Sequence, residues 1–552
     1  MLVLVRYIVV LMTLLSISLN AQEPIEAKID AIINTYNKPD LPGLGIRIIK
    51  GDSIIYSRAI GVSNLDYGVK NKDSTVFSIA SISKQFTASA IWSLIQTNKI
   101  SLEDDVRKYL PELPNYDSVI KIKHLLNHTG GIRGYHTLMY LSGFDYDNVY
   151  YDNNTVLKLA CKQKNLNNIP GEKVVYSNTH YNLLALVIER VSNMNLNAYL
   201  KEHILDPLKM NQTFVRVEHG KPIKHKAVGY QYKNNEYKFY SSNQLSYGAG
   251  SMGSSMIDMT IWMQMLNGEV PAFKSLSQFL KTTELLPSGE KAKYARGVML
   301  DSYKGYKTVS HSGFGFGGQS QLITVPDESI GVVIMTNLQS INPTPISYRV
   351  LDVLLPKKLK ENKVVNTNVN INSVAFKKFI GEYKEVNSDM KMTISLEKDT
   401  LRALSSLGKK EIPLIPFEKD KFSRLYNESV KYDFSKLSNY DLIITFGGTP
   451  FYFQRAKFVD PVSVNLRDYA GVFYSEELDT DYRFYIEGDE LKLSYKNNEN
   501  IALFPVQLNE FGNNDRTLYR FTKDKSNRVI AMYLSCDGQV SNIEFVKQKN
   551  RL

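Results

Sequence analysis

The stretch FSIASISK, residues 77–84, places a serine three residues before a lysine at the start of a segment with helical spacing. Positions i and i+3 share one face of a helix, so Ser81 and Lys84 can reach the same carbonyl group. A hydroxyl is a weak nucleophile at its ordinary pKa, and an amine in a partly desolvated pocket can take its proton near neutral pH. The stretch therefore predicts a nucleophile and its base. The other side of the helix would be buried through Ile82, Phe86, Ala90, Ile91, Leu94 and Ile95.

The four-residue spacing recurs elsewhere in the chain and is not specific by itself. The other pairs are Ser118 with Lys121, Ser288 with Lys291, Ser395 with Lys398, and Ser406 with Lys409. Those pairs lie in polar, lysine-rich stretches that are typical of solvated loops or strand edges. Ser81 differs because it follows a predicted strand, begins an apolar helix and has partner motifs downstream.

The first partner motif is YSN, residues 176–178, which follows a turn signal at Pro170 and Gly171 and precedes a helical apolar stripe. Beside a lysine ammonium, the Tyr176 phenol is expected to ionise below its usual pKa of about 10 and to move protons between Ser81, the leaving group and water. Asn178 offers a donor and an acceptor to a substrate amide. Taken alone, the motif fits an aromatic residue at a helix start on the rim of the core better than it fits a catalytic site.

The second partner motif is HSGFGFGG, residues 311–318, between two strand-like runs. Glycines would let this backbone approach a ligand closely. On an edge strand facing Ser81, the N–H groups of Phe314 and Ser81 would form an oxyanion hole. A glycine-rich hairpin with an incidental histidine is the alternative. The substrate-binding candidates of this motif are His311, Ser312, Gly313 and Phe314.

The motifs SISK, YSN and HSG, in that order, resemble the serine β-lactamase and penicillin-binding-protein superfamily, in its class C-related branch. The flanking stretches STVFSIASISKQFTASAI, IKIKHLLNHTGGI and ESIGVVIMTNL are also similar, so that the resemblance runs from about Leu41 to Leu355. It implies that Ser81 is the acylated nucleophile, that Lys84 and Tyr176 are the acid and base pair, and that Asn178 contacts the substrate amide.

Two positions depart from the family pattern. His311 stands where many relatives carry lysine, and histidine is mostly neutral at pH 7. Peptidase, amidase or esterase activity is therefore expected ahead of β-lactamase activity. If His311 bound a substrate carboxylate as a cation, activity on acidic substrates would fall as pH rises through the His311 pKa. Gly131 stands where the family often has serine, and we interpret it as structural.

The resemblance implies an α/β catalytic domain of the β-lactamase and transpeptidase type, in which helices flank an antiparallel sheet and a helical insertion carries Tyr176. Local signals agree, because residues 44–50 and 53–60 are typical of a hairpin and residues 331–337 of a buried strand. His124 and His128 have metal-ligand spacing but lack a zincin glutamate and nearby acidic residues, so no metal or cofactor is expected.

The C-terminal third contains a repeat: FIGEY at Phe379 matches YAGVF at Tyr469, at an offset of 90 residues. Alternating apolar and polar residues predict an all-β region of two tandem, barrel-like repeats, forming either one larger barrel or two small ones. The region either limits access to the active site, as appended barrels of relatives do, or is a passive module. The expected boundaries are a signal peptide at 1–21, the hydrolase domain at 22–356, a linker at 357–372, and repeats at 373–460 and 461–552.

Arg6 followed by a short apolar run and Ala21 predicts a cleaved secretory signal, and hence a periplasmic or extracellular protein, with an uncleaved signal anchor as the alternative. The run is too short to span a bilayer stably, which takes about 20 apolar residues. The net charge of +11 is spread thinly, which argues against nucleic-acid binding. Cys161 and Cys536 lie in different predicted domains, so a disulfide between them is not expected.

The favoured hypothesis is a secreted serine hydrolase that acts through an acyl-enzyme on a small amide or ester, such as a D-amino-acid peptide. That activity would be a carboxypeptidase, a D-aminopeptidase or an esterase, and the partner a small molecule or peptide, for example one derived from peptidoglycan. The alternatives are a class C-like β-lactamase and a weakly catalytic penicillin-binding or regulatory protein. The natural substrate and the oligomeric state stay open.

Overall fold

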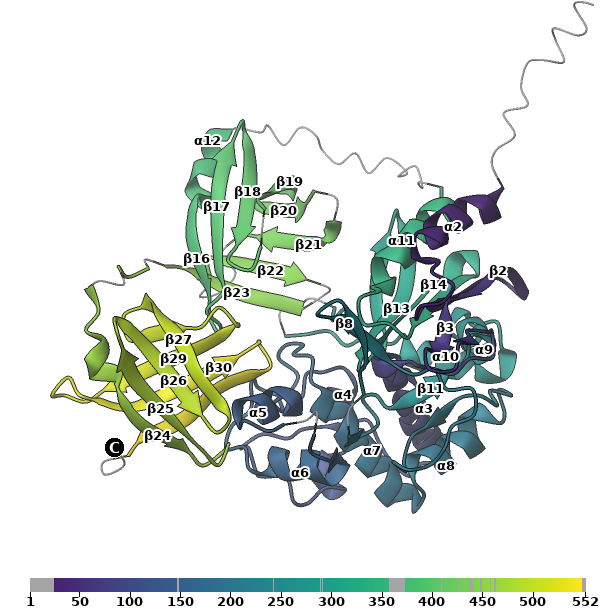
Figure 1. Cartoon of the computed structure of the whole chain (residues 1–552), viewed down its shortest axis with the longest axis horizontal. Coiled ribbons are helices and arrows are strands. Elements are labelled where there is room, and N and C mark those ends of the chain that lie inside the picture. The colour runs from purple at the N-terminus through teal and green to yellow at the C-terminus, as the bar shows by residue number, and fades with distance from the viewer. Residues whose placement is uncertain are drawn as a thin grey trace, which may run out of the picture.

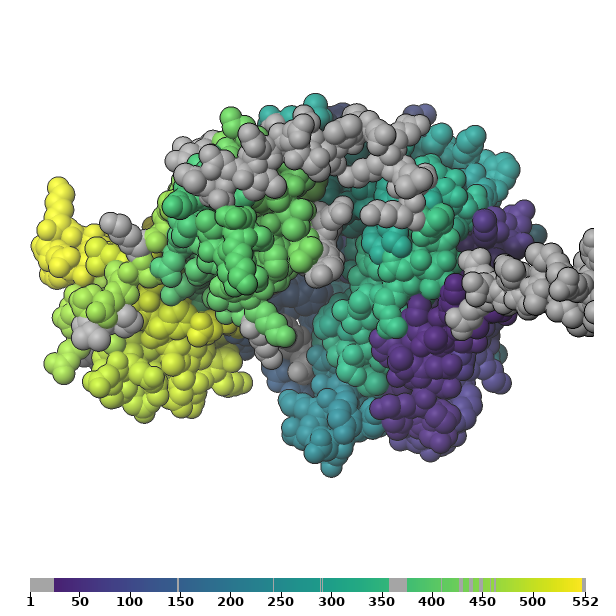
Figure 2. All heavy atoms as spheres, turned by 90° about the horizontal axis from the view of Figure 1, so that it is seen from above, coloured from purple at the N-terminus to yellow at the C-terminus, as the bar shows by residue number. Residues whose placement is uncertain are grey.

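The computed structural model describes residues 24–548 except 146–147, 242, 288, 290, 357–372, 409, 426, 436–439, 447–448, 457 and 461–462. The expected signal peptide and linker lie outside the described residues. Within the described part of the chain, an α/β domain comes first and two all-β units follow, and the two units lie to one side of the α/β domain in both Figure 1 and Figure 2.

The α/β domain is built on a six-stranded sheet with the order β12-β13-β14-β15-β1-β2, and every neighbouring pair is antiparallel. The pairing of β1 with β15 joins the two ends of the domain, and the predicted hairpin and buried strand are present. The strands are β1 (Leu44–Lys50), β2 (Ser53–Ile60), β12 (Met299–Tyr303), β13 (Tyr306–Gly315), β14 (Gly318–Val325) and β15 (Ile330–Thr336).

Helices cover both faces of this sheet because its central strands are apolar on both sides. Val332 and Ile334 of β15 pack on one face with α2 (Ile25–Ile33) and α11 (Pro343–Leu354). Val333 and Met335 pack on the other face with α3 (Ser83–Gln96) and α9 (Met256–Asn267). The remaining longer helices are α4 (Ile122–Leu126), α5 (Tyr135–Leu141), α6 (Asn153–Cys161), α7 (Asn178–Ser192), α8 (Leu196–Leu200) and α10 (Lys274–Leu280).

A small three-stranded sheet contains the strand that directly precedes the SISK motif. Its order is β5 (Phe77–Ser78), β11 (Met252–Ser254) and β7 (Phe214–Val215), and β5 leads directly into the short helix η2 (Ala80–Ile82). The helices α4 to α8 lie between β5 and β11 in sequence, as the predicted helical insertion does. Three two-stranded pairs complete the domain: β3 (Val62–Asn64) with β4 (Val69–Lys70), β6 (Tyr151–Asp152) with β10 (Gln244–Leu245), and β8 (Tyr230–Lys233) with β9 (Glu236–Phe239).

The repeat in the sequence corresponds to two separate closed barrels, β16 to β23 and β24 to β31. Phe379 and Tyr469, the matched first residues of the repeat, occupy the two barrel cores. The first barrel contains β16 (Gly381–Glu385), β17 (Lys391–Glu397), β18 (Thr400–Ser405), β19 (Ile412–Glu418), β20 (Lys421–Arg424), β21 (Asn427–Asp433), β22 (Leu442–Phe446) and β23 (Thr449–Arg455). The second contains β24 (Gly471–Ser475), β25 (Thr480–Glu487), β26 (Glu490–Tyr495), β27 (Asn498–Gln507), β28 (Glu510–Gly512), β29 (Thr517–Lys523), β30 (Val529–Cys536) and β31 (Val540–Lys547).

The second barrel is joined to the helical insertion through α5. Leu138 and Leu141 of α5 belong to the same buried cluster as the barrel core, and the Tyr482 hydroxyl donates to the carbonyl of Leu141 at 2.7 Å. Figure 1 shows the yellow barrel beside α5 and α6. None of the helices in the described residues is both long and apolar enough to cross a membrane.

Candidate active site

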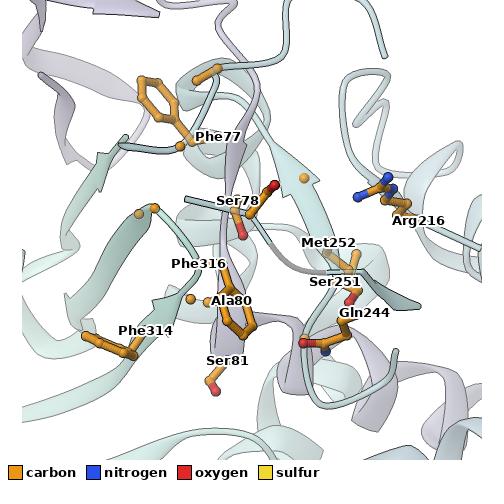
Figure 3. A pocket seen from close by; sticks show the side chains of 18 of the residues that line it. Phe77, Ser78, Ala80, Ser81, Arg216, Gln244, Ser251, Met252, Phe314 and Phe316 are labelled. Carbon is orange, nitrogen blue, oxygen red and sulfur yellow. The ribbon is translucent and has the colours of Figure 1, made fainter. Parts of the chain in front are cut away.

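Ser81 lies on a strained turn between β5 and α3. The preceding residue, Ala80, has a φ of +43°, a left-handed conformation that a residue with a side chain rarely adopts. Such strain persists only where surrounding contacts enforce it, and it concentrates at functional sites. The Ser81 side chain is half-buried and borders the pocket drawn in Figure 3.

The structure brings together the hydroxyl, the amine and the phenol that the sequence singles out. The Oγ of Ser81 lies 3.0 Å from the Nζ of Lys84 and 3.0 Å from the hydroxyl of Tyr176. Lys84 comes from the first turn of α3, whereas Tyr176 lies 95 residues downstream of Ser81, just before α7. Both groups therefore contact the same oxygen from different elements.

Lys84 is fully buried, and burial lowers its pKa well below the ordinary lysine value. No carboxylate forms an ion pair with Lys84 in the described part of the chain. Nζ lies 2.8 Å from both Asn178 Oδ1 and the carbonyl of Ala249, and 3.0 Å from Ser81 Oγ. An ammonium can donate to all three oxygens, whereas a neutral amine donates to two and has a lone pair for the Ser81 hydroxyl.

The expectation that the Tyr176 phenol ionises easily is wrong. Burial raises the pKa of Tyr176, and its hydroxyl donates to Ser81. The lowering was expected from a lysine ammonium, but desolvation of the phenol is the largest effect, and burial also lowers the pKa of Lys84. The ring of His128 lies 4.3 Å from that of Tyr176 and helps to exclude water. Tyr176 is therefore a neutral phenol that can give a proton to Ser81 or to a leaving group.

Asn178 is held by the protein at both ends of its amide. Its Oδ1 accepts from Lys84, and its Nδ2 lies 3.2 Å from the Nδ1 of His136. Burial, followed by the charge of Lys84, lowers the pKa of His136 to about 4. Both Asn178 and His136 border the pocket. No sequence motif marks His136, which lies in the stretch that follows HTGG.

Strand β13 presents a free edge to the nucleophile turn. Strand β12 pairs only with Tyr306 to Ser310, so residues 311–315 have no partner strand on that side among the described residues. A Cβ on Gly313 would lie 2.5 Å from the carbonyl oxygen of Ile79, and hence only glycine fits there. The exposed Phe314 borders the pocket. The oxyanion hole at the N–H groups of Ser81 and Phe314 stays a prediction.

His311 does not fit the role of a cation for a substrate carboxylate. Burial, with the charge of Lys84 as the second cause, lowers its pKa to about 3, so the ring is neutral at pH 7. Its Nε2 lies 3.0 Å from the hydroxyl of Tyr294, and its Nδ1 lies 2.6 Å from the carbonyl oxygen of Ser312. Both nitrogens thus have partners within the protein. The neighbouring Ser312 side chain is exposed.

The pocket beside Ser81 has a volume of about 220 Å³. Aromatic rings form much of its wall, among them Phe77, Tyr135, Phe214, Tyr240, Phe314 and Phe316. Arg216 and Lys226, which no sequence motif marks either, bring two positive charges to it. All of its described wall residues lie between Val76 and Asn337, so the barrels contribute none. The expectation that the barrels limit access to the site gains no support from this wall.

Comparison with known proteins places residues 29–354, more than half of the chain, within the Beta-lactamase family model. The chain is 29% identical over 331 residues to Protein flp of Staphylococcus aureus, covering 57% of this chain and 63% of that protein. It is 29% identical over 302 residues to Penicillin-binding protein 4* of Bacillus subtilis, covering 52% and 66%. The chain thus spans less than two thirds of these relatives.

Among solved structures, the octameric penicillin-binding protein homologue from Pyrococcus abyssi is similar with a TM-score of 0.54 and 24% identity, covering 86% of this chain and 98% of that one. That likeness concerns the fold and extends beyond the α/β domain into the barrels. Together with the family match over residues 29–354, the fold identifies the chain as a member of the beta-lactamase family.

Proposed function

We propose that the protein is a serine hydrolase that forms an acyl-enzyme at Ser81. The observation that carries the proposal is the position of Ser81 Oγ, 3.0 Å from both a buried amine and a half-buried phenol. A protein that only binds ligands has no need of this arrangement. Membership of the beta-lactamase family supports the same activity.

In the proposed acylation, the Ser81 oxygen attacks the carbonyl carbon of the substrate while its proton passes to the neutral amine of Lys84. The tetrahedral intermediate then collapses, and the bond to the leaving group breaks. Tyr176 gives its proton to the leaving amine or alcohol, and the ammonium of Lys84 then gives its proton to the Tyr176 phenolate, so that both groups return to their starting forms. Backbone N–H groups of Ser81 and Phe314 would stabilise the oxyanion.

In the proposed deacylation, water attacks the ester carbonyl and loses a proton to the Lys84 and Tyr176 pair. The bond to Ser81 breaks, and the serine oxygen regains a proton from the same pair. The products are a carboxylic acid and the free hydroxyl of Ser81, so the cycle consumes only water. No cofactor is needed for this sequence of steps.

The proposed substrate is a small amide or ester, such as a D-amino-acid peptide. The modest pocket supports this size, and the kinship with a protein named as a penicillin-binding protein supports a peptide of this kind. We also propose that the reaction takes place outside the cytoplasm, because residues 1–21 have the pattern of a secretory signal.

A second candidate is a protein that reacts with penicillins, as the name of the Bacillus subtilis relative indicates for that protein. Incubation with a fluorescent penicillin separates the two cases. Rapid release of a penicilloyl adduct would support β-lactamase activity. A long-lived adduct would support a penicillin-binding protein, and no adduct would favour a peptidase or esterase.

The proposed function is tested by a substrate screen with D-alanyl dipeptides, D-amino-acid amides and short acyl esters. We expect turnover of at least one class by the native chain and none by Ser81→Ala. The control variant Ser83→Ala separates loss of chemistry from loss of fold, because the Ser83 hydroxyl donates to the carbonyl of Ala80 and forms no hydrogen bond with Lys84 or Tyr176 in the described structure. Equal turnover by native chain and Ser81→Ala would refute the proposal.

A further inference from the structure

We propose that the pocket beside Ser81 selects substrates with an anionic group, a carboxylate or a phosphate, which Arg216 and Lys226 bind. This inference rests on the proposed function and names its substrate class. Figure 3 shows the Arg216 side chain across the pocket from Ser81. The neutral His311 cannot supply this charge, so the two cations would replace the lysine that many relatives carry at that position.

The charged side chains that border the pocket are all positive among the described residues. Arg216 and Lys226 border it, and no aspartate or glutamate does so among the described residues. In the same described part of the chain, neither cation forms an ion pair with a carboxylate. Two like charges that share a pocket repel each other, and a bound anion relieves that repulsion. The pocket is therefore electrostatically prepared for an anion.

Unused hydrogen-bonding capacity points the same way. The Nε of Arg216 is buried and has no hydrogen-bond partner within the described structure, whereas its Nη2 donates to the carbonyl of His219 at 2.7 Å. A buried donor without a partner is unfavourable, and an anion oxygen would satisfy it. Partial desolvation, and next the charge of Arg216, lower the pKa of Lys226. That second cause agrees with two cations that face the same space.

Backbone contacts place both residues beside the nucleophile turn. The N–H of Arg216 donates to the carbonyl of Ser251 at 2.9 Å, two residues beyond Ala249, which binds Lys84. Lys226 forms a parallel bridge with Val76, the residue before β5. These bonds fix the backbone of both residues before binding, so only their side chains lose conformational entropy when an anion arrives.

The rings around the pocket add a further requirement. Phe214, Phe316 and Tyr240 border the space together with the two cations. Apolar surface in the same pocket as Ser81 and the two cations favours an apolar stem between the scissile carbonyl and the anionic group. The expected substrate is therefore a small acyl donor with a short hydrocarbon segment and a terminal negative charge.

Matched ester pairs test the inference on the full chain. In the first pair, 4-nitrophenyl esters of adipic acid and of its neutral carboxamide differ only in the charge of the acyl part. In the second, the acetates of 4-hydroxybenzoic acid and 4-hydroxybenzamide differ only in the charge of the leaving group. A phosphonate in place of each carboxylate distinguishes a phosphate-bearing source from a carboxylate-bearing one. The measured quantity is the ratio of kcat/KM between charged and neutral members.

We expect the native chain to prefer the charged member of at least one pair, and this preference to fall about tenfold in Arg216→Gln and in Lys226→Gln. It should also weaken as salt concentration rises, because these charges are partly exposed to solvent. The matched control is Lys221→Gln, which removes an exposed charge from the same segment but does not border the pocket. That control should keep the preference of the native chain.

The outcomes separate this inference from the proposed function. If neutral esters are hydrolysed at Ser81 but neither pair shows a preference for charge, the inference is wrong and the proposed function stands. A preference that survives in both Arg216→Gln and Lys226→Gln also overturns the inference. If no ester is hydrolysed and no fluorophosphonate modifies Ser81, both fail.

Discussion

Replacing Glu477 by alanine should destabilise the α/β domain, although Glu477 belongs to the second barrel. Its carboxylate lies 2.5 Å from Nη1 of Arg133, and the two side chains are 2% and 0% exposed. Glu477 also accepts from the backbone N–H of Lys164 at 2.8 Å. Burial lowers the pKa of Arg133, and the attraction of Glu477 opposes that change. Without Glu477, a buried guanidinium would lose its only carboxylate partner among the described residues.

Removing one partner of a buried ion pair costs about 3–5 kcal/mol. At a denaturant slope of about 3 kcal/mol per molar urea, the lower figure corresponds to a shift of about 1 M in the unfolding midpoint. Both tryptophans, Trp92 and Trp262, lie in the α/β domain, so their fluorescence follows this domain rather than the barrel. Urea unfolding followed by tryptophan fluorescence is therefore the assay.

The neighbouring residue supplies a matched control. Glu476 pairs with Lys164 at 2.6 Å, but its side chain is 75% exposed, so Glu476→Ala should change the midpoint very little. The double variant Arg133→Met with Glu477→Leu should recover most of the loss, because it leaves no unpaired buried charge. A midpoint for Glu477→Ala equal to that of Glu476→Ala would refute the reasoning.

The other predictions concern the site and its pH dependence. Acylation of Ser81 should accelerate as pH rises through the pKa of Lys84, because only the neutral amine accepts a proton. Burial holds that pKa below 10.5. A rate of Ser81 labelling by a fluorophosphonate that is constant from pH 5 to 10 would contradict this. Gly313→Ala should lower stability by about 1–3 kcal/mol in thermal unfolding, since its Cβ would meet Ile79, whereas Gly220→Ala, with nothing nearby, should not. Four histidines have pKa values of about 3 to 4 in the folded chain, against about 6.5 in the unfolded chain. The free energy of unfolding should therefore be retained above pH 6.5 and fall as the pH decreases toward 4, by up to about 1.4 kcal/mol per pH unit for each histidine. Equal unfolding midpoints at pH 7 and pH 5 would contradict this. The four histidines are His124, His136, His180 and His311.

Local sequence patterns allowed the main elements of the fold to be predicted. The hairpin of β1 and β2 and the start of α3 depend on neighbouring residues, and the two barrels repeat one another in sequence, although the repeat alone left open whether they form one barrel or two. The order of the three motifs pointed to the residues that meet at Ser81. These features depend on composition and spacing, which the sequence displays directly.

The electrostatics of the site could not be predicted, because burial depends on residues that are distant in sequence. The pKa of Tyr176 is raised, not lowered, where the rings of His128 and Tyr294 pack against it. Lys226 reaches the pocket through a bridge to Val76, 150 residues earlier in the chain. No local pattern indicates such a pairing.

The packing of α5 against the second barrel also could not be predicted from the sequence. Leu138 and Leu141 have the spacing of any helix that packs on its own domain, yet they complete the core of a barrel more than 300 residues away. The same segment carries His136, which contacts Asn178. The barrel therefore supports one wall of the site without bordering the pocket itself.

The central claim is that Ser81 becomes a nucleophile because Lys84 removes its proton. Peptide mass spectrometry of the full chain after treatment with a fluorophosphonate tests it directly. We expect one adduct on Ser81, none in Ser81→Ala, and labelling slowed by at least about 100-fold in Lys84→Met, which keeps the volume of the buried side chain. An adduct at another residue, or equal labelling rates for the native chain and Lys84→Met, would contradict the account.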